Sequence, residues 1–312
     1  MSFHIAATTL DGVRLDRAAL AGLAVVLLWA SAFPAIQVAA PDLGAVGLSV
    51  VRLVVATVAL LLLATVRRVR FPSVRELGWI VAAGFFGMTA YQLLLNVSEL
   101  HVPAGTASII VSAAPLVSVA VARALFQEPV TRTTMVGSAV AFAGVVVVCL
   151  SRAGVSLSTA VWVVVAAMVV QGVYHPLQRP LLRTRSGLEV ATYTMGAGTL
   201  MTLPLVPLGW DQLRDATVGG WVAAVYLGLL PSALGFVLWA YAVGRLPIAA
   251  STSLLYLVPP VAVLIAWIWL GEVPLPAEVL GGAIVIAGVV VVTQGPRLRA
   301  RPRSRTAAGA AT

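Results

Sequence analysis

Arg52 is the residue whose position most needs a chemical explanation. It lies inside the apolar stretch Leu43 to Val66, and an arginine in the middle of a bilayer costs about 2.5 kcal/mol or more unless it finds a partner. Backbone carbonyl groups, a water-filled cavity and an anionic group of a substrate are the partners open to it. The sequence therefore predicts either a structural pairing inside the protein or contact with an anionic ligand.

Two stripes of small or polar residues could line a path for a solute. Ser108, Ser112 and Pro115 follow one another at i, i+4 and i+7, which places them on one face of a helix. A shift of 144 residues repeats the pattern at Thr252, Tyr256 and Pro259. Small hydroxyl residues also let helices pack closely, so the stripes indicate either cavity lining or helix packing.

Further polar or aromatic side chains fall at the depth of the bilayer core. A shift of 142 residues places Trp29 under Gln171, and each is followed by a proline. Aromatic residues near the ends of spans are typical of the interface belt, but Trp29 is central. The further candidates for substrate binding are Trp29, Ser31, Tyr91, Gln171, Tyr174, His175 and Trp239.

Four prolines inside apolar stretches are candidate hinges. Each frees the carbonyl group four residues earlier, and that group must then face protein or water rather than lipid. A single proline of this kind is as readily a structural kink. Because these occur in corresponding pairs, we expect hinges or cavity walls at Pro34, Pro115, Pro176 and Pro259.

Residue types that commonly catalyse reactions or bind metals are scarce in this chain. The chain has three histidines and one cysteine, Cys149, and its spans carry no central acid pair. We therefore expect no catalytic residues, no metal site and no cofactor. A membrane-embedded enzyme is the less favoured alternative.

Composition identifies the class of protein. Apolar residues make up 60% of the chain and charged residues 10%, and the mean hydropathy is +1.01. Soluble domains average about 25% charged residues, so this composition indicates an integral membrane protein. The apolar runs lack the period-two alternation of barrel strands, which leaves helices. All 20 basic residues are arginines, and most of them lie in short connections or near the termini, a pattern of membrane topology rather than of nucleic-acid binding.

Apolar runs near the length of about 20 residues that crosses a bilayer recur along the chain. They predict ten spans: Ala18 to Ala40, Leu43 to Val66, Leu77 to Leu95, Ala104 to Phe126, Thr133 to Leu150, Leu157 to Gln178, Leu188 to Leu208, Gly219 to Val243, Ile248 to Leu270 and Ala277 to Val292.

The arginines predict how these spans are oriented. With both termini inside, the inner segments hold 17 arginines, whereas the outer segments hold only Arg152 and Arg214. We therefore expect a multi-pass plasma (inner) membrane protein with both termini cytoplasmic. Residues 1–17 form a cytoplasmic lead, and the basic tail 297–312 is expected to be disordered.

An internal duplication organises the whole chain. The shift of 144 residues places Glu128 under Glu272 and Gly84 under Gly228, so residues 18–150 and 157–292 are two repeats. Each repeat has an odd number of spans, so the second enters the membrane from the opposite face, as in many secondary transporters. The glycines Gly137, Gly144, Gly281 and Gly288 indicate close helix packing in spans five and ten, where a homodimer is also left open.

The motifs and their order resemble the ten-helix, EamA-type members of the drug/metabolite transporter superfamily. The resemblance rests on LLWASAFPAI from Leu27, VRLVVA around Arg52, the AGTAS and AASTS starts of spans four and nine, and the glycines of GSAVAFAGV and GGAIVIAGV. It departs at Gln127, where the family usually has glycine. It implies an all-α membrane protein of two inverted five-helix repeats, with a central cavity lined by spans one, three, four, six, eight and nine.

The expected function is that of a secondary transporter that exports a small metabolite, amino acid or drug-like solute by alternating access. A facilitator, channel or receptor without active transport is the alternative, although a channel or receptor does not need an inverted repeat. The expected partners are a small-molecule solute and the lipid bilayer, and no nucleic acid.

Overall fold

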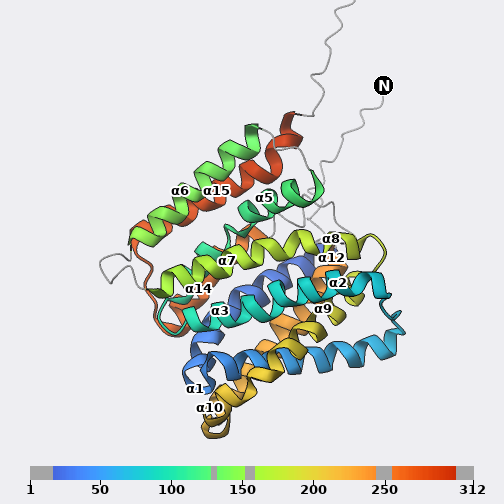
Figure 1. The fold of residues 1–312 in the computed structure, drawn as a ribbon. Coiled ribbons are helices and arrows are strands. Elements are labelled where there is room, and N and C mark those ends of the chain that lie inside the picture. The colour runs from blue at the N-terminus through green and yellow to red at the C-terminus, as the bar shows by residue number, and fades with distance from the viewer. Residues whose placement is uncertain (1–16, 128–131, 152–158, 244–254, 300–312) are drawn as a thin grey trace, which may run out of the picture.

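A computed structural model describes residues 17–127, 132–151, 159–243 and 255–299, and within them every regular element is a helix (Figure 1). Here η1 and η4 are π-helical, and η3 and η5 are 3₁₀-helical. The elements in chain order are α1 (Arg17–Arg67), α2 (Val74–Gly84), η1 (Phe85–Ala90), α3 (Tyr91–Ser98), α4 (Ala104–Val111), α5 (Ala114–Phe126), α6 (Arg132–Ser151), α7 (Thr159–Leu177), α8 (Arg179–Leu182), α9 (Gly187–Thr202), η3 (Leu203–Gly209), α10 (Trp210–Asp215), α11 (Val218–Leu227), η4 (Gly228–Leu234), α12 (Gly235–Val243), η5 (Leu255–Leu257), α14 (Val258–Leu270) and α15 (Pro276–Arg299).

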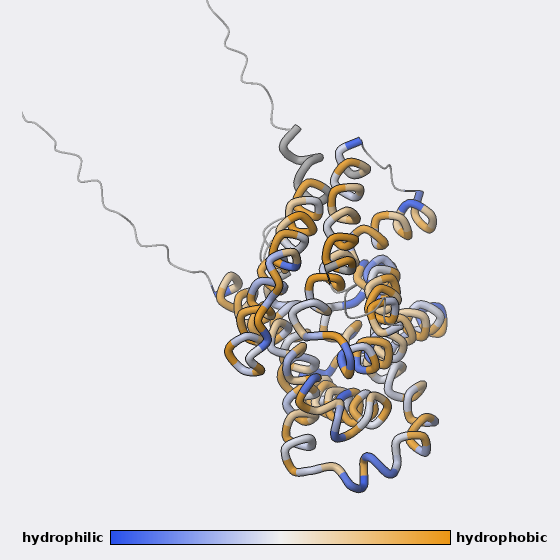
Figure 2. The backbone as a smooth tube through the Cα atoms, turned by 90° about the vertical axis from the view of Figure 1, so that its left-hand side faces the viewer, coloured by the Kyte–Doolittle hydropathy of each residue, from blue (hydrophilic) through white to orange (hydrophobic). Residues whose placement is uncertain are grey.

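The helices have the length and composition of membrane spans. Five continuous helical stretches are long and apolar enough to cross a bilayer, and three shorter ones are also apolar (Figure 2). The large side chains on their outer surfaces are apolar, for example Phe142 and Ile268. The prediction of an all-α integral membrane protein is confirmed.

Helix α1 contains both of the first two predicted spans. Its two arms fold back on each other at Gly44, where φ is 66° and ψ is 161° (Figure 1). A side chain rarely tolerates a positive φ, so glycine permits a reversal here with no separate loop. The second arm carries Arg52 back into the helix bundle.

The two spans with central prolines are broken at corresponding positions. Helix α4 ends at Val111 and α5 starts at Ala114, with Pro115 in its first turn. In the second repeat, η5 gives way to α14, whose first turn holds Pro259. Proline fits a first helical turn because its missing N–H has no helical acceptor there. Pro34 and Pro176 differ, because they lie inside the continuous helices α1 and α7.

The duplication extends to an irregularity that the sequence pattern did not reveal. The third and eighth predicted spans each contain a π-helical segment, η1 (Phe85–Ala90) between α2 and α3 and η4 (Gly228–Leu234) between α11 and α12. The shift of 144 residues carries the first onto the second. π-Helical turns are rare and occur frequently at functional sites.

The two repeats pack mainly against each other. Helix α1 contacts α9, α11, η4, α12 and α14 of the second repeat, and α7 contacts η1, α3, α4 and α5 of the first. These contacts correspond under the duplication, because α14 repeats α5 and η4 repeats η1. The interface of the repeats therefore runs through the middle of the molecule.

Helices α6 and α15 lie side by side at the edge of the molecule (Figure 1). A Cβ atom on Gly144 would come within 2.7 Å of the carbonyl oxygen of Gly281, and one on Gly288 within 2.6 Å of the carbonyl oxygen of Gly137. The glycine faces therefore serve the predicted close packing within one chain. A homodimer through these helices would use their outward faces, and it stays a prediction.

Candidate functional site

Arg52 lies in the second arm of α1 and is only 7% exposed. Its Nε donates a hydrogen bond of 3.0 Å to the hydroxyl of Ser232 in η4. Its Nη1 is buried and has no hydrogen-bond partner among the described residues. The guanidinium group therefore bridges the two repeats and keeps an unused donor. Its observed partner is a hydroxyl, which was not among the partners considered from the sequence.

A row of buried polar residues connects α1 to α3. Ser49, Arg52, Gln92, Asn96 and Glu99 form this row, which we call the polar row. The Asn96 amide donates to the Ser49 hydroxyl at 2.8 Å, and that hydroxyl donates to the carbonyl of Ala45 at 2.7 Å. The sequence pattern indicated Arg52 as a candidate, whereas Glu99 falls just beyond the third predicted span, Leu77 to Leu95. Glu99 does follow the last residue of α3, but it is buried.

The predicted aromatic residues Trp29 and Trp239 meet across the repeat interface. Their ring centroids are 5.5 Å apart, and Phe236 lies 5.6 Å from Trp29. The Trp29 indole N–H donates to the carbonyl of Pro231 in η4 at 3.0 Å. The π-helical segment thus holds partners for both Trp29 and Arg52.

Ser31 has a partner that the sequence pattern did not indicate. Its hydroxyl lies 2.6 Å from the hydroxyl of Tyr226 in α11 and also donates to the carbonyl of Leu28. A tyrosine inside the eighth predicted span was the available signal. Tyr91, another predicted residue, is half-buried and within electrostatic range of Arg52.

The hydroxyl groups of the first stripe, those of Ser108 and Ser112, donate hydrogen bonds to backbone carbonyl groups three residues earlier in the chain. Ser108 donates to the carbonyl of Gly105 at 2.7 Å and Ser112 to that of Ile109 at 2.6 Å. In the second repeat, the Tyr256 hydroxyl donates to the carbonyl of Val289 in α15 at 3.3 Å, whereas Thr252 lies outside the described residues. Only the Tyr256 bond joins two helices, so cavity lining and helix packing both stay predictions for the stripes.

The three candidates of the sixth predicted span, Gln171, Tyr174 and His175, lie on α7 in different environments. Tyr174 is buried in a core cluster, against Gly87 of η1. Gln171 is half-buried, with its Oε1 buried and without a partner among the described residues. His175 is exposed, with its ring 5.6 Å from that of Tyr174. The structure therefore does not gather these three side chains at one point.

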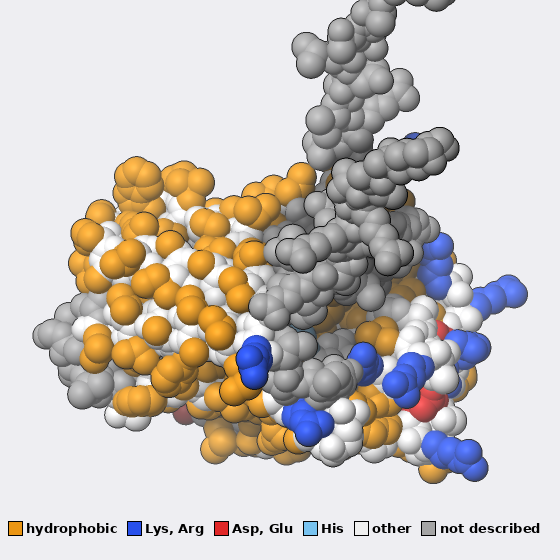
Figure 3. Space-filling model, turned by 90° about the horizontal axis from the view of Figure 1, so that it is seen from above, with side chains coloured by type: hydrophobic (Ala, Val, Ile, Leu, Met, Phe, Trp, Pro, Cys, Tyr) orange, Lys and Arg blue, Asp and Glu red, His pale blue; other side chains and the backbone are white. Residues whose placement is uncertain are grey.

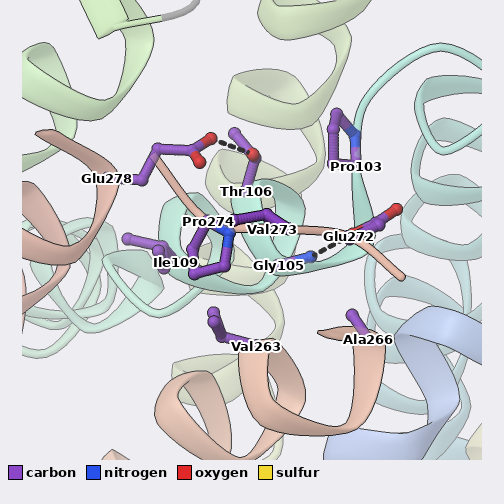
Figure 4. Close-up of a pocket in the computed structure, with 10 residues that line it drawn as sticks. All are labelled: Pro103, Gly105, Thr106, Ile109, Val263, Ala266, Glu272, Val273, Pro274 and Glu278. Atoms are coloured by element: carbon purple, nitrogen blue, oxygen red, sulfur yellow. Dashed lines mark hydrogen bonds between the residues drawn. The ribbon is translucent and has the colours of Figure 1, made fainter. Parts of the chain in front are cut away.

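At the arginine-poor end of the bundle, the acid after α14 binds the start of α4. The Glu272 carboxylate accepts hydrogen bonds from the backbone N–H groups of Ala104 and Gly105, at 3.3 and 3.4 Å. Free N–H groups at a helix N-terminus favour an anion, so this contact joins the two repeats. Thr106 also donates to Glu278 beside a small pocket (Figure 4). None of the predicted substrate-binding residues lines this pocket.

At the opposite end, arginines gather around the turns between helices (Figure 3). Arg185 donates to both carboxylate oxygens of Glu76, at 2.8 and 2.9 Å, and to the carbonyl of Arg70 at 2.8 Å. The bond to Glu76 raises the pKa of Arg185 above its ordinary value, so the group stays charged. Arg70 in turn pairs with Glu189 at 3.2 Å. This network joins the turn before α2 to the turn before α9.

Replacing Arg185 with alanine is expected to lower the melting temperature of the purified protein by roughly 3 °C, because it removes a two-pronged ion pair and a turn contact. Thermal unfolding in detergent measures this shift. Arg214→Ala is the matched control, since the Arg214 side chain is 71% exposed and makes one 3.5 Å contact. Equal shifts in the two variants would show that the network contributes nothing.

Comparison with known proteins identifies the family. A model described as the EamA-like transporter family matches residues 16–150 and, a second time, residues 158–294. The chain belongs to this family. The predicted resemblance is therefore confirmed, and both repeats of this EamA-like protein are matched.

Its relatives are transporters by name. A protein of Streptantibioticus cattleyicolor named as a probable terminal-alkyne amino-acid exporter is 49% identical over 292 residues, which cover 94% of this chain and 98% of that protein. The uncharacterised transporter YdfC of Bacillus subtilis is 30% identical over 263 residues, covering 84% of this chain and 86% of that one. A crystal structure with 20% identity and a TM-score of 0.62, covering 91% of this chain and 98% of its own, shares the fold of this EamA-like protein.

Proposed function

We propose that the protein is a secondary transporter that exports a small amino acid across the plasma membrane by alternating access between its two inverted repeats. The observation that carries the proposal is Arg52, which is buried at the repeat interface and keeps Nη1 without a partner among the described residues. A guanidinium group with a free donor fits a carboxylate, which every amino acid supplies.

Two further observations support this proposal. The relative that is 49% identical is named as a probable amino-acid exporter. In addition, contacts between the repeats occur at both ends of the bundle, through Glu272 at one and through Arg185 and Glu76 at the other. Alternating access requires such contacts to open at one end while those at the other end hold.

Transport into proteoliposomes tests the proposal. The probe is L-propargylglycine, an α-amino acid with a terminal alkyne, chosen after the name of the relative. Purified protein should accelerate its counterflow, with a rate that saturates at turnover-limited values. Flux at channel-like rates, or chemical conversion of the probe, would favour a pore or an enzyme. Absence of any flux above empty vesicles would contradict an amino-acid exporter.

We further propose that both termini are cytoplasmic, because the predicted inner segments hold 17 arginines and the outer segments two. Single cysteines in a Cys149→Ser background test this orientation in intact cells. A cysteine at Arg214 should react with an impermeant maleimide without permeabilisation, and one at Arg70 only after it. The reverse pattern would contradict the orientation.

A further inference from the structure

Glu99 is a buried carboxylate that no described group satisfies. It follows the last residue of α3, is 3% exposed, and both of its carboxylate oxygens lack a hydrogen-bond partner among the described residues. An isolated charge in the protein interior costs several kcal/mol. Such a group is rarely kept without a partner, a ligand or a proton.

The charged and titratable groups around Glu99 do not account for it. Arg52 of α1 and Tyr91 of α3 lie within electrostatic range, and Glu272, which follows α14, repels it. No ion pair within 4.0 Å joins Arg52 to Glu99 in the described structure, and Arg52 also has an unused donor. The cation and the anion are therefore held near each other without closing into a pair.

On the side of α3 that carries Glu99, the buried atoms left without a partner among the described residues are all acceptors. Gln92, Asn96 and Glu99 follow at i, i+4 and i+7, so they share one helix face. The buried atoms without partners on this face are Gln92 Oε1, Asn96 Oδ1 and the two carboxylate oxygens of Glu99. All four accept hydrogen bonds and none donates, so the face fits a ligand group with several N–H donors.

We infer that Glu99 and Asn96 recognise the ammonium group of an α-amino acid whose carboxylate is held by Arg52. The inference rests on the proposed function and names the chemistry of its substrate, a zwitterion. An ammonium group has three donors and a positive charge, which match the acceptor face. A sodium ion would also suit oxygen ligands, but it would leave Nη1 of Arg52 without a partner.

Four compounds that share the terminal-alkyne chain of propargylglycine test recognition of the ammonium group and of the carboxylate separately. L-Propargylglycine carries both charged groups, 4-pentynoic acid lacks the ammonium group, N-acetylpropargylglycine has it blocked, and but-3-yn-1-amine lacks the carboxylate. Wild-type protein in proteoliposomes should prefer propargylglycine over 4-pentynoic acid by at least about 100-fold in initial rate, because the analogue leaves the acceptors unpaired. The blocked compound should behave like the pentynoic acid.

Glu99→Gln should reduce this preference to below about 10-fold, mainly by slowing propargylglycine. Glu99→Asp, which keeps the carboxylate, should retain most of the preference. Asp215→Asn is the control, because it removes an acid whose side chain is 71% exposed and should leave the preference unchanged. All variants are compared at equal amounts of monodisperse, reconstituted protein.

Three results would overturn the inference. The first is that Glu99→Gln retains the wild-type preference for propargylglycine over 4-pentynoic acid. The second is that a folded Glu99→Gln protein transports both compounds more slowly by the same factor, which would make Glu99 structural. The third is a sodium requirement for wild-type flux that disappears in Glu99→Gln. If the wild type moves none of the four compounds, the proposed function fails and the inference fails with it.

Discussion

Replacing Arg52 with glutamine is expected to reduce transport of propargylglycine at least about 100-fold while the protein remains folded. The Arg52 guanidinium group is buried at the repeat interface and offers a charged fork of donors that fits a carboxylate. Glutamine can still donate to Ser232, the observed partner of the Arg52 Nε atom. Because the substitution removes a buried charge, the melting temperature should stay equal or rise.

The lysine variant refines this test. Arg52→Lys keeps the charge but loses the planar fork, so we expect transport between that of the wild type and that of Arg52→Gln. Initial rates in proteoliposomes and thermal unfolding are measured on the same preparations. Normal transport by Arg52→Gln would contradict a role for Arg52 in binding the substrate and would leave it a structural residue. A folding defect in both variants would do the same.

Replacing Gly288 with alanine is expected to lower the melting temperature by roughly 5 to 10 °C. The new methyl group would overlap the backbone nitrogen of Ala141 and lie 2.6 Å from the carbonyl oxygen of Gly137, and backbone atoms cannot move aside as a flexible side chain can. Overpacking of this kind typically costs about 1 to 3 kcal/mol. Helices α6 and α15 would have to separate.

Gly78→Ala is the matched control for this packing, because a methyl group at Gly78 would meet no atom of a neighbouring described element within 4 Å. Alanine has the higher helix propensity, so this variant should be as stable as the wild type or slightly more so. Thermal unfolding in detergent compares the two. A melting temperature for Gly288→Ala equal to that of Gly78→Ala would contradict close packing of α6 on α15.

The sequence predicted the features that repeat or that depend on composition. Apolar run lengths predicted an all-α membrane protein. The duplication pointed to Pro115 and Pro259 as candidate hinges or cavity walls, and the structure interrupts both helices beside these prolines. Arg52 stood out because a charge in an apolar span is energetically anomalous. Each of these signals can be read from residue type and spacing alone.

Other features depended on contacts between distant segments. The partners of Arg52 and Ser31, which are Ser232 and Tyr226, come from the eighth span, and no local pattern connects them. Glu99 lies at a helix end, where an acid is ordinarily solvated, and its burial follows from how neighbouring helices cover it. Hinges at Pro34, Pro115, Pro176 and Pro259 and the substrate contacts of all the predicted residues stay predictions.

The paired π-helical segments bear on the history of the chain. A π-helical turn arises when one residue is inserted into an α-helix, and η1 and η4 occupy corresponding positions in the two repeats. Two independent insertions at the same position are a less economical explanation than one insertion in a single-repeat ancestor. The inverted arrangement that we propose then requires two copies of a five-span ancestor that entered the membrane in opposite orientations. A chain inserted both ways cannot carry a strong arginine bias, so under this proposal the bias toward one side arose after the two copies were fused.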